Sequence, residues 1–174
     1  MKQTGFPPVA DKKVVVLVLG SMPGAESLKQ QQYYAYLHNA FWPIMGELFG
    51  FDPALPYSDR LTALMQNHVA LWDVAHQCVR PGSLDSNIRD AEANDFSSFF
   101  KAHAKIESVF FNGTTAEQLY RKLVFPKLPA TLRQLPKLRL PSTSPAHAGM
   151  TVAQKLELWR EVRRKRDQAL SNNR

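Results

Sequence analysis

The sequence is poor in the features that cross-link proteins and in those that cross membranes. Among its 174 residues Cys78 is the single cysteine, which excludes an internal disulfide and favours a reducing cytosol. No apolar run approaches the ~20 residues that span a bilayer, and no basic region followed by an apolar one indicates a signal peptide. The histidines show no paired ligand spacing. We therefore expect a cytoplasmic protein without a membrane segment, metal or cofactor.

Acidic residues are scarce relative to basic ones. The chain has 22 Lys and Arg against 15 Asp and Glu, a net charge of +7. This excess favours polyanionic partners, nucleic acid first, although it serves solubility equally well. The length of 174 residues suits one domain with a substantial core. We expect a monomer with a single domain over residues 1–174 and a basic C-terminal end at 163–174 that can fray.

Apolar runs alternate with helix-compatible segments along the chain. Strands are expected at residues 14–19, 68–74, 106–111 and 138–140. Helices are expected at 25–36, 41–49, from Ser58 or Asp59 to 67, from Asn94 or Asp95 to 104, from Thr114 or Thr115 to 123, and at 151–170. Residues 1–12, 78–88 and 124–136 are expected to be irregular. This alternation predicts an α/β protein, a three-layer α/β/α domain around a central four-stranded parallel sheet.

The carboxyl ends of the four predicted strands collect small and amide residues. They are the turns 20–24, 73–88, 112–115 and 141–148, of which the second begins at Asp73 and the third at Asn112. Because parallel strands bring these ends to one edge, where ligands bind in open α/β sheets, we expect a site there. The group 38–42 adds an amide at Asn39 and an aromatic ring two residues later. This pairing predicts a pocket that stacks on, and hydrogen-bonds to, a planar ring.

Taken together, these segments resemble the uracil-DNA glycosylase superfamily, and within it the hypoxanthine-DNA glycosylase (DNA-deoxyinosine glycosylase) branch. The resemblance covers residues 14–160 and is carried by 20–24, 32–34 with 39–42, Asp73 with 80–88, 112–113 and 140–146. It implies a uracil-DNA glycosylase-like fold. It also implies a monofunctional DNA-repair glycosylase that hydrolyses the N-glycosidic bond of deaminated bases, hypoxanthine above all, in base excision repair. Its partner would be DNA containing deaminated bases.

The same resemblance assigns roles to individual residues. It implies that Asn39, the asparagine before Phe-Trp, is catalytic. Implied substrate-binding residues are Gly20, Ser21, Met22, Pro23, Gly24, Phe41, Asp73 and Asn112. Implied DNA-binding residues are Ser142, Thr143, Ser144, Pro145, Ala146 and His147. In chemical terms Phe41 offers a stacking face, and Asp73 and Asn112 are candidates for reading the base edge. The hydroxyls of 142–144 can donate to phosphates.

Two positions depart from the superfamily pattern. Met22 stands where most members have Asp or Asn, which activates or positions the attacking water, and Leu140 stands where several members have histidine. Because Met22 cannot take that role, these departures argue against uracil excision by the mechanism usual in the superfamily. The alternatives are a uracil- or xanthine-DNA glycosylase of the same fold and a catalytically inactive nucleic-acid-binding module. A hydrolase using Ser21 or Ser142 is disfavoured, because neither serine lies in a glycine-flanked elbow.

Each site residue also has a purely structural interpretation. Asn39 suits the start of the helix at 41–49, and Phe41 suits the core. Asp73 and the Asn112–Gly113 pair are typical turn formers, and the serines of 142–144 suit hydroxyl-capped turns. Arg80 and Asp85 can pair within their own loop.

Overall fold

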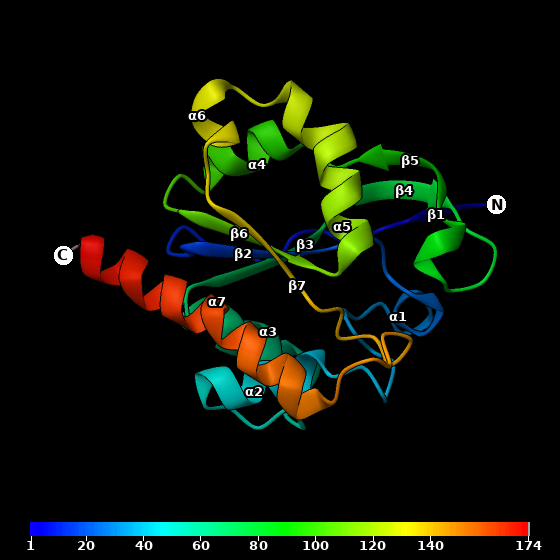
Figure 1. Cartoon of the computed structure of the whole chain (residues 1–174), viewed down its shortest axis with the longest axis horizontal. Helices are drawn as coiled ribbons and strands as arrows, with labels where there is room; N and C mark the ends of the chain where they lie inside the picture. The colour runs from blue at the N-terminus through cyan, green and yellow to red at the C-terminus, as the bar shows by residue number, and fades with distance from the viewer. Residues whose placement is uncertain (174) are drawn as a thin grey trace.

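A four-stranded parallel sheet forms the centre of the computed structural model, which describes residues 1–173 (Figure 1). The strand order is β3-β2-β6-β7, and every neighbouring pair is parallel. The strands are β2 (Val16–Gly20), β3 (Val69–Asp73), β6 (Ser108–Asn112) and β7 (Lys137–Leu140). Every residue of β2, β3 and β6 is buried, as expected for strands covered on both faces. The predicted α/β class and parallel sheet are therefore confirmed.

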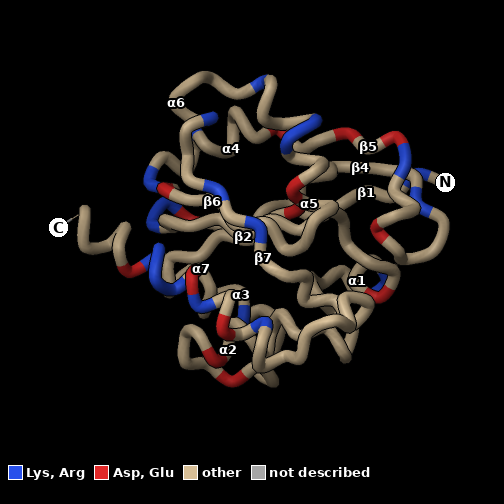
Figure 2. Tube along the Cα trace, viewed as in Figure 1, with Lys and Arg blue, Asp and Glu red and all other residues tan. Residues whose placement is uncertain are grey.

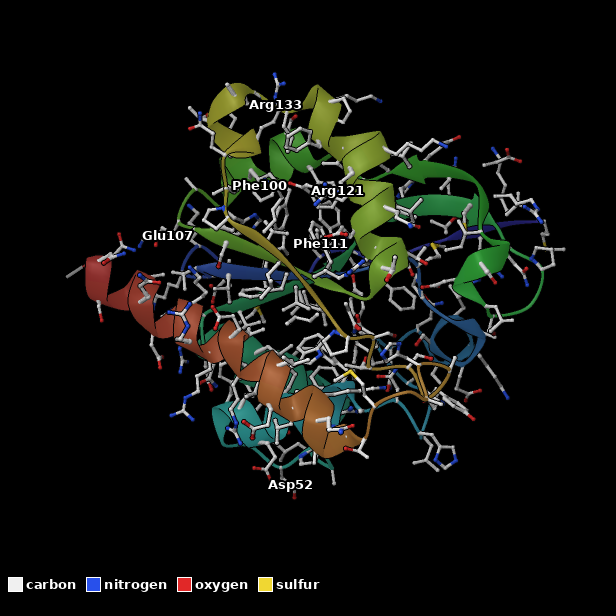
Figure 3. All side chains as sticks on the ribbon, viewed as in Figure 1. Asp52, Phe100, Glu107, Phe111, Arg121 and Arg133 are labelled. Atoms are coloured by element: carbon white, nitrogen blue, oxygen red, sulfur yellow. The ribbon has the colours of Figure 1, made fainter. Side chains whose placement is uncertain are left out.

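Helices cover both faces of this sheet (Figure 1). One face carries α2 (Phe41–Phe49), α3 (Tyr57–Gln66) and α7 (Val152–Asn172). The other carries α4 (Phe96–Ala102), α5 (Thr114–Leu119) with its π-helical continuation Tyr120–Val124 and the 3-10 turn Phe125–Lys127, and α6 (Ala130–Arg133). Figure 3 shows Phe100 and Phe111 between the sheet and this second helix layer, and Asp52, Glu107 and Arg133 towards the periphery of the molecule.

A second, smaller sheet was not predicted. Residues 1–12 were expected to be irregular, but β1 (Lys2–Thr4) pairs with β4 (Ala75–Val79). The expected loop 78–88 includes the end of β4, and a 3-10 turn at Asp85–Asn87 leads into β5 (Arg89–Ala93). The three strands form an antiparallel sheet in the order β1-β4-β5. Its strands are short and two of them are mostly polar, so they lack the apolar runs that indicated the main sheet.

The first predicted helix is shorter than expected. We predicted a helix over residues 25–36, but α1 spans Ala25–Gln30. The backbone of Gln31 has a φ of 55° and that of Tyr34 a φ of 53°, in the left-handed region that ends a right-handed helix. Residues 31–40 therefore form a loop, and this loop reaches the sheet edge described below.

The long last helix is well anchored. Thr151 and Gln154 form a reciprocal capping box at its start. The basic segment 163–166 is helical, and three of its arginines pair with Glu161 or Asp167. The helix continues to Asn172, residue 174 lies outside the described residues, and fraying of this end remains a prediction. None of the helices in residues 1–173 has the length and apolar character to cross a membrane.

Trp159 joins this helix to the sheet edge. Its side chain is fully buried, its ring packs edge-on against Phe41 with 6.2 Å between centroids, and its Nε1 donates to the carbonyl of Pro141 at 2.9 Å. The residue thus fixes the segment that follows β7 as well as the packing of α7 on α2.

Replacing Trp159 with alanine should lower the free energy of unfolding by about 3–5 kcal/mol, the usual cost of truncating a buried aromatic residue. Urea denaturation measures this loss. The control Leu158→Ala, at a position that is 50% exposed, should change stability by less than about 0.5 kcal/mol. Equal effects of the two substitutions would contradict the anchoring role of Trp159.

Candidate functional site

The carboxyl ends of the strands meet at one edge of the main sheet, from which α1, α5 and α7 lead away (Figure 1). Gly20 pairs directly with Asp73 in the register of β2 and β3. A Cβ atom on Gly20 would lie 2.4 Å from Asp73 Oδ1 and 2.9 Å from Tyr34 Oη. Only glycine therefore allows the carboxyl and the phenol to approach the end of β2 this closely.

Asn112 holds two further segments at this edge. Its Oδ1 accepts from the backbone N–H of Thr143 at 2.9 Å, and its Nδ2 donates to Thr143 Oγ1 at 2.9 Å and to Tyr34 Oη at 3.0 Å. Both amide hydrogens are thus in use. In this arrangement Asn112 positions its neighbours, and reading a base would require one of these bonds to break.

The loop 31–40, called the Asn39 loop below, lies against the segment that follows β7. The backbone N–H of Ala40 donates to the carbonyl of Thr143 at 3.0 Å. Asn39 Oδ1 accepts from the N–H of Phe41 at 2.9 Å, which forms a turn just before α2, whose N-cap is Ala40 and not Asn39. Its Nδ2 makes no hydrogen bond within residues 1–173, and the residue is partly exposed. An amide that can bind a ligand therefore remains at the sheet edge.

The stacking face predicted at Phe41 is not accessible in the structure. Phe41 is 0% exposed: Tyr34 stacks on it with 4.0 Å between centroids, and Trp42 and Trp159 pack edge-on against it. The Tyr34 ring is partly exposed and carries the phenol that Asn112 holds. Tyr34 thus covers the face of Phe41 and lies between that ring and Asn112. The family resemblance included residues 32–34 but assigned no role to Tyr34.

The segment predicted to bind DNA divides into a buried and an exposed part. Thr143 is 1% exposed and its hydroxyl is bound to Asn112, so the predicted phosphate contact by this side chain is not available. Ser142 and Ser144 accept backbone hydrogen bonds through their hydroxyl oxygens and keep their O–H protons for a ligand. Pro145, Ala146 and His147 are exposed. The accessible DNA-facing candidates are therefore the two serines and residues 145–147.

The glycine turn 20–24 is held by the connection between β4 and β5. Ser21 Oγ donates to Asp85 Oδ2 at 2.9 Å, and buried Arg80 donates to the carbonyl of Pro23 through Nη2. The Met22 side chain packs with Ala75 and Cys78, away from any polar role. Gly24 precedes α1 as its N-cap. Arg80 and Asp85, which sequence analysis treated only as a loop pair, are thus the residues that shape this turn.

Asp73 is the electrostatic anomaly of the site. It is 4% exposed, and its Oδ2 has no hydrogen-bond partner within residues 1–173. Burial raises the pKa of Asp73 to about 7, the charge of Asp85 adds to this effect, and Arg80 opposes it. Burial likewise raises the pKa of Tyr34. A buried carboxyl without a partner is costly and marks a functional candidate.

Two surface hollows lie away from these residues. One hollow of about 490 Å³ lies between residues 91–97 and 123–128, and another of about 370 Å³ lies between β7 and α7. Neither is lined by a predicted site residue. At the sheet edge itself, the Tyr34 ring covers Phe41 and reaches Gly20 and Asn112.

Comparisons with known proteins agree on one family. Residues 7–163 match the family model described as the uracil DNA glycosylase superfamily. A hypoxanthine DNA glycosylase of Methanosarcina barkeri is 41% identical over 114 residues, which cover 65% of this chain and 72% of the relative. A hypoxanthine DNA glycosylase of Methanosarcina acetivorans is 40% identical over 67% of this chain and 74% of its own length.

A solved structure is also similar over nearly the whole fold. The solution NMR structure of a uracil DNA glycosylase candidate from Methanosarcina acetivorans superposes with a TM-score of 0.80 at 35% identity. The match covers 96% of this chain and 99% of that chain. The fold of the chain, including the sheet edge, is therefore that of this structure.

The buried carboxyl of Asp73 should make stability depend on pH in a defined direction. Because its pKa is raised from 3.8 to about 7, the folded protein retains a proton that the unfolded chain has lost between these pH values. Stability then falls as pH rises through this window. Asp73→Asn removes the effect, so the variant should gain roughly 2–4 kcal/mol over the wild type at pH about 8 and nearly nothing at pH about 4.

Urea unfolding of both proteins across this pH range provides the measurement. Asp90→Asn serves as the control, because Asp90 is exposed and its left-handed backbone suits asparagine. A gain from Asp73→Asn that is the same at low and high pH would contradict a buried, proton-retaining carboxyl.

Proposed function

Because the chain belongs to the uracil DNA glycosylase superfamily, we propose that it is a DNA glycosylase that removes deaminated bases, hypoxanthine first. The names of the two Methanosarcina relatives support this substrate. The observation that carries the proposal is the contact between the Asn39 loop and the segment 142–144 through Ala40 N–H and the Thr143 carbonyl. It brings a free amide, an aromatic ring and hydroxyls together at one edge. One copy of the chain supplies all of them, so we propose that it acts as a monomer.

The enzyme would act on a base turned out of the duplex. Extruding a base costs a few kcal/mol, and less when its pair is imperfect. The inosine pairs that arise when adenine is deaminated are imperfect, which favours their selection. The extruded purine would stack on Tyr34, the role first assigned to Phe41, a contact worth ~1–3 kcal/mol per base. The hydroxyls of Ser142 and Ser144 would hold the flanking phosphates.

Cleavage of the N-glycosidic bond builds positive charge on the sugar and negative charge on the departing base. The amide of Asn39 is neutral and cannot act as a true general base, but it can orient the attacking water. Its free Nδ2 and its position beside the hydroxyl-bearing segment suit this task. Backbone N–H groups of the turn 20–24 would stabilise charge on the base. Met22 adds packing and no proton transfer.

Asp73 is the proposed reader of the base edge. Hypoxanthine presents an N1–H donor beside the O6 acceptor, whereas adenine presents an acceptor at N1 and a donor at N6. The ionised carboxylate accepts only, so it favours N1–H and disfavours adenine N1. Its unpartnered Oδ2 gives it an acceptor that no protein group uses. Uracil shows the same order of donor and acceptor at N3 and O4, which makes uracil the second candidate substrate.

The assay that tests the proposal uses labelled duplexes containing inosine, uracil or xanthine, followed by alkaline cleavage of abasic sites. The wild type should produce abasic product most rapidly from inosine. Asn39→Ala should lower the single-turnover rate by at least about 100-fold, the usual lower range for a positioned catalytic group. Binding of these duplexes without any abasic product would instead identify an inactive binding module. Full activity of Asn39→Ala would place catalysis elsewhere.

Base discrimination by Asp73 should depend on its ionisation. Because the pKa of Asp73 is about 7, the preference for inosine over adenosine should increase as pH rises through that value. Asp73→Asn should reduce this preference by about 10–100-fold at pH about 8, equivalent to ~1–3 kcal/mol for a base-edge contact, and should abolish its pH dependence. Single-turnover rates and competition binding on matched duplexes measure both effects. Unchanged discrimination in the variant would refute the assignment.

A further inference from the structure

The net positive charge of the chain is concentrated in one stretch of the sequence. Residues 101–140 contain eight Lys and Arg but only two acidic residues, Glu107 and Glu117, which gives a net charge of +6. The rest of the chain contains fourteen Lys and Arg against thirteen Asp and Glu, a net charge of +1. A charge that served solubility alone would not need to gather in one stretch. The excess therefore points to one surface of the molecule.

Few of these cations have an acidic partner. Arg121 and Arg139 each lie 3.7 Å from a carboxyl oxygen of Glu117, and the other six make no ion pair within residues 1–173. The last helix shows the contrast, because four arginines of α7 each pair with an acidic residue one to four positions away. Figure 2 shows basic and acidic residues together on α7, whereas mainly basic residues lie along β7 and around α6.

Four of the cations lie close together between the second helix layer and β7. Glu117 bridges Arg121 of the π-helical continuation and Arg139 of β7. Lys137 Nζ donates to the carbonyl of Arg133 at 2.7 Å. Burial lowers the pKa of Lys137, and the nearby charge of Arg121 lowers it further, because the two cations repel each other. We call Arg121, Arg133, Lys137 and Arg139 the basic patch.

The basic patch begins one residue from the candidate site. Asn112 pairs with Leu140 where β6 and β7 end. Arg139 lies one position and Lys137 three positions before Leu140 on β7. At ~3.3 Å per residue, Lys137 is about 10 Å along the strand from Leu140, roughly the rise of three DNA base pairs. Because β7 leads directly into the exposed segment that faces DNA, a duplex held at the sheet edge can also reach the patch.

The composition of this surface favours a nucleic acid over a protein as its partner. Protein interfaces are built on apolar and aromatic anchors and are poor in lysine. Among the exposed large hydrophobic side chains of residues 1–173, only that of Leu138 belongs to the stretch 101–140. Arginine and lysine side chains without counter-ions suit phosphate oxygens, which they bind through charge-assisted hydrogen bonds.

We propose that the basic patch binds the phosphate backbone of the duplex beside the damaged nucleotide, outside the segment 142–147. This inference deepens the proposed function and rests on it for the identity of the polyanion. It adds a contact that neither the everted base nor the phosphates at Ser142 and Ser144 make. Such a contact strengthens binding to any duplex, whatever its sequence, and takes no part in cleavage of the N-glycosidic bond.

The test removes two charges of the patch in the double variant Arg121→Gln/Arg139→Gln, at positions that are both exposed. Affinity for an undamaged duplex is measured by fluorescence anisotropy between about 50 and about 200 mM salt. The slope of log K against log salt should fall by between about one and about two, since each phosphate contact contributes about one and the two arginines share Glu117. The variant Arg121→Lys/Arg139→Lys keeps both charges and should retain the wild-type slope.

A matched control removes the same charge elsewhere. Lys12 and Lys13 are exposed and precede β2, at the opposite end of that strand from Gly20. Lys12→Gln/Lys13→Gln should therefore leave the slope unchanged. The urea midpoint of Arg121→Gln/Arg139→Gln should match that of the wild type, because exposed ion pairs contribute little to stability.

A second readout separates binding from catalysis. With enzyme at saturating concentration, the single-turnover rate of Arg121→Gln/Arg139→Gln on an inosine duplex should stay within about twofold of the wild-type rate, because the patch touches no reacting atom. The enzyme concentration that gives half of this rate should rise, since the variant binds the duplex less tightly.

Three results would overturn the inference. A wild-type slope for Arg121→Gln/Arg139→Gln would remove DNA from the patch. An equal loss of slope in Lys12→Gln/Lys13→Gln would indicate general charge loss. Weaker binding of the patch variant to a duplex RNA, together with an unchanged DNA slope, would assign the patch to RNA. Failure of the proposed function shows separately, as absence of abasic product from the wild type while binding to undamaged DNA still depends on the patch.

Discussion

The side chain of Asn112 is the constraint that assembles the candidate site. Three hydrogen bonds from one amide join the end of β6 to the backbone and hydroxyl of Thr143 and to the phenol of Tyr34. Without them the segment after β7 and the loop 31–40 would have no polar connection to Asn112. The bond from Ala40 to the Thr143 carbonyl extends the same connection to Asn39. A buried amide with all these bonds made is rigid, and rigidity is what a positioned active site needs.

One buried acidic group near Asn112 lacks a hydrogen-bond partner among the described residues. Asp73 lies at the end of β3 with one carboxyl oxygen unpartnered within residues 1–173. Burial raises its pKa, and the base edge of a bound nucleotide is the partner that we propose for it. The cost in stability is thus located where complementary substrate groups are expected.

Much of this architecture could be predicted from the sequence because the main strands are continuous apolar runs. The segment 14–19 and the helix Phe41–Phe49 follow directly from apolar composition and spacing. The small sheet could not be predicted, because β1 pairs with a strand more than 70 residues away and neither has a distinctive pattern. The left-handed backbone of Gln31, which ends α1, has no signal in its residue type, so the helix predicted over 25–36 was too long.

The structure brings many of the predicted site residues to one sheet edge, but the contacts of several differ from the roles expected for them. Residue types place amides and hydroxyls at strand ends, but they do not reveal which partners those groups already have. Thr143 and Phe41 were both expected to face the ligand, and tertiary contacts bury both.

The most direct test of the central claim is a crystal structure of the protein with a duplex that carries an uncleavable deoxyinosine analogue. Our account predicts an everted hypoxanthine on the Tyr34 ring, with N1–H directed at Asp73 and the flanking phosphate over the loop 142–147. A base that remains stacked in the duplex, or that enters the hollow between residues 91–97 and 123–128, would contradict it.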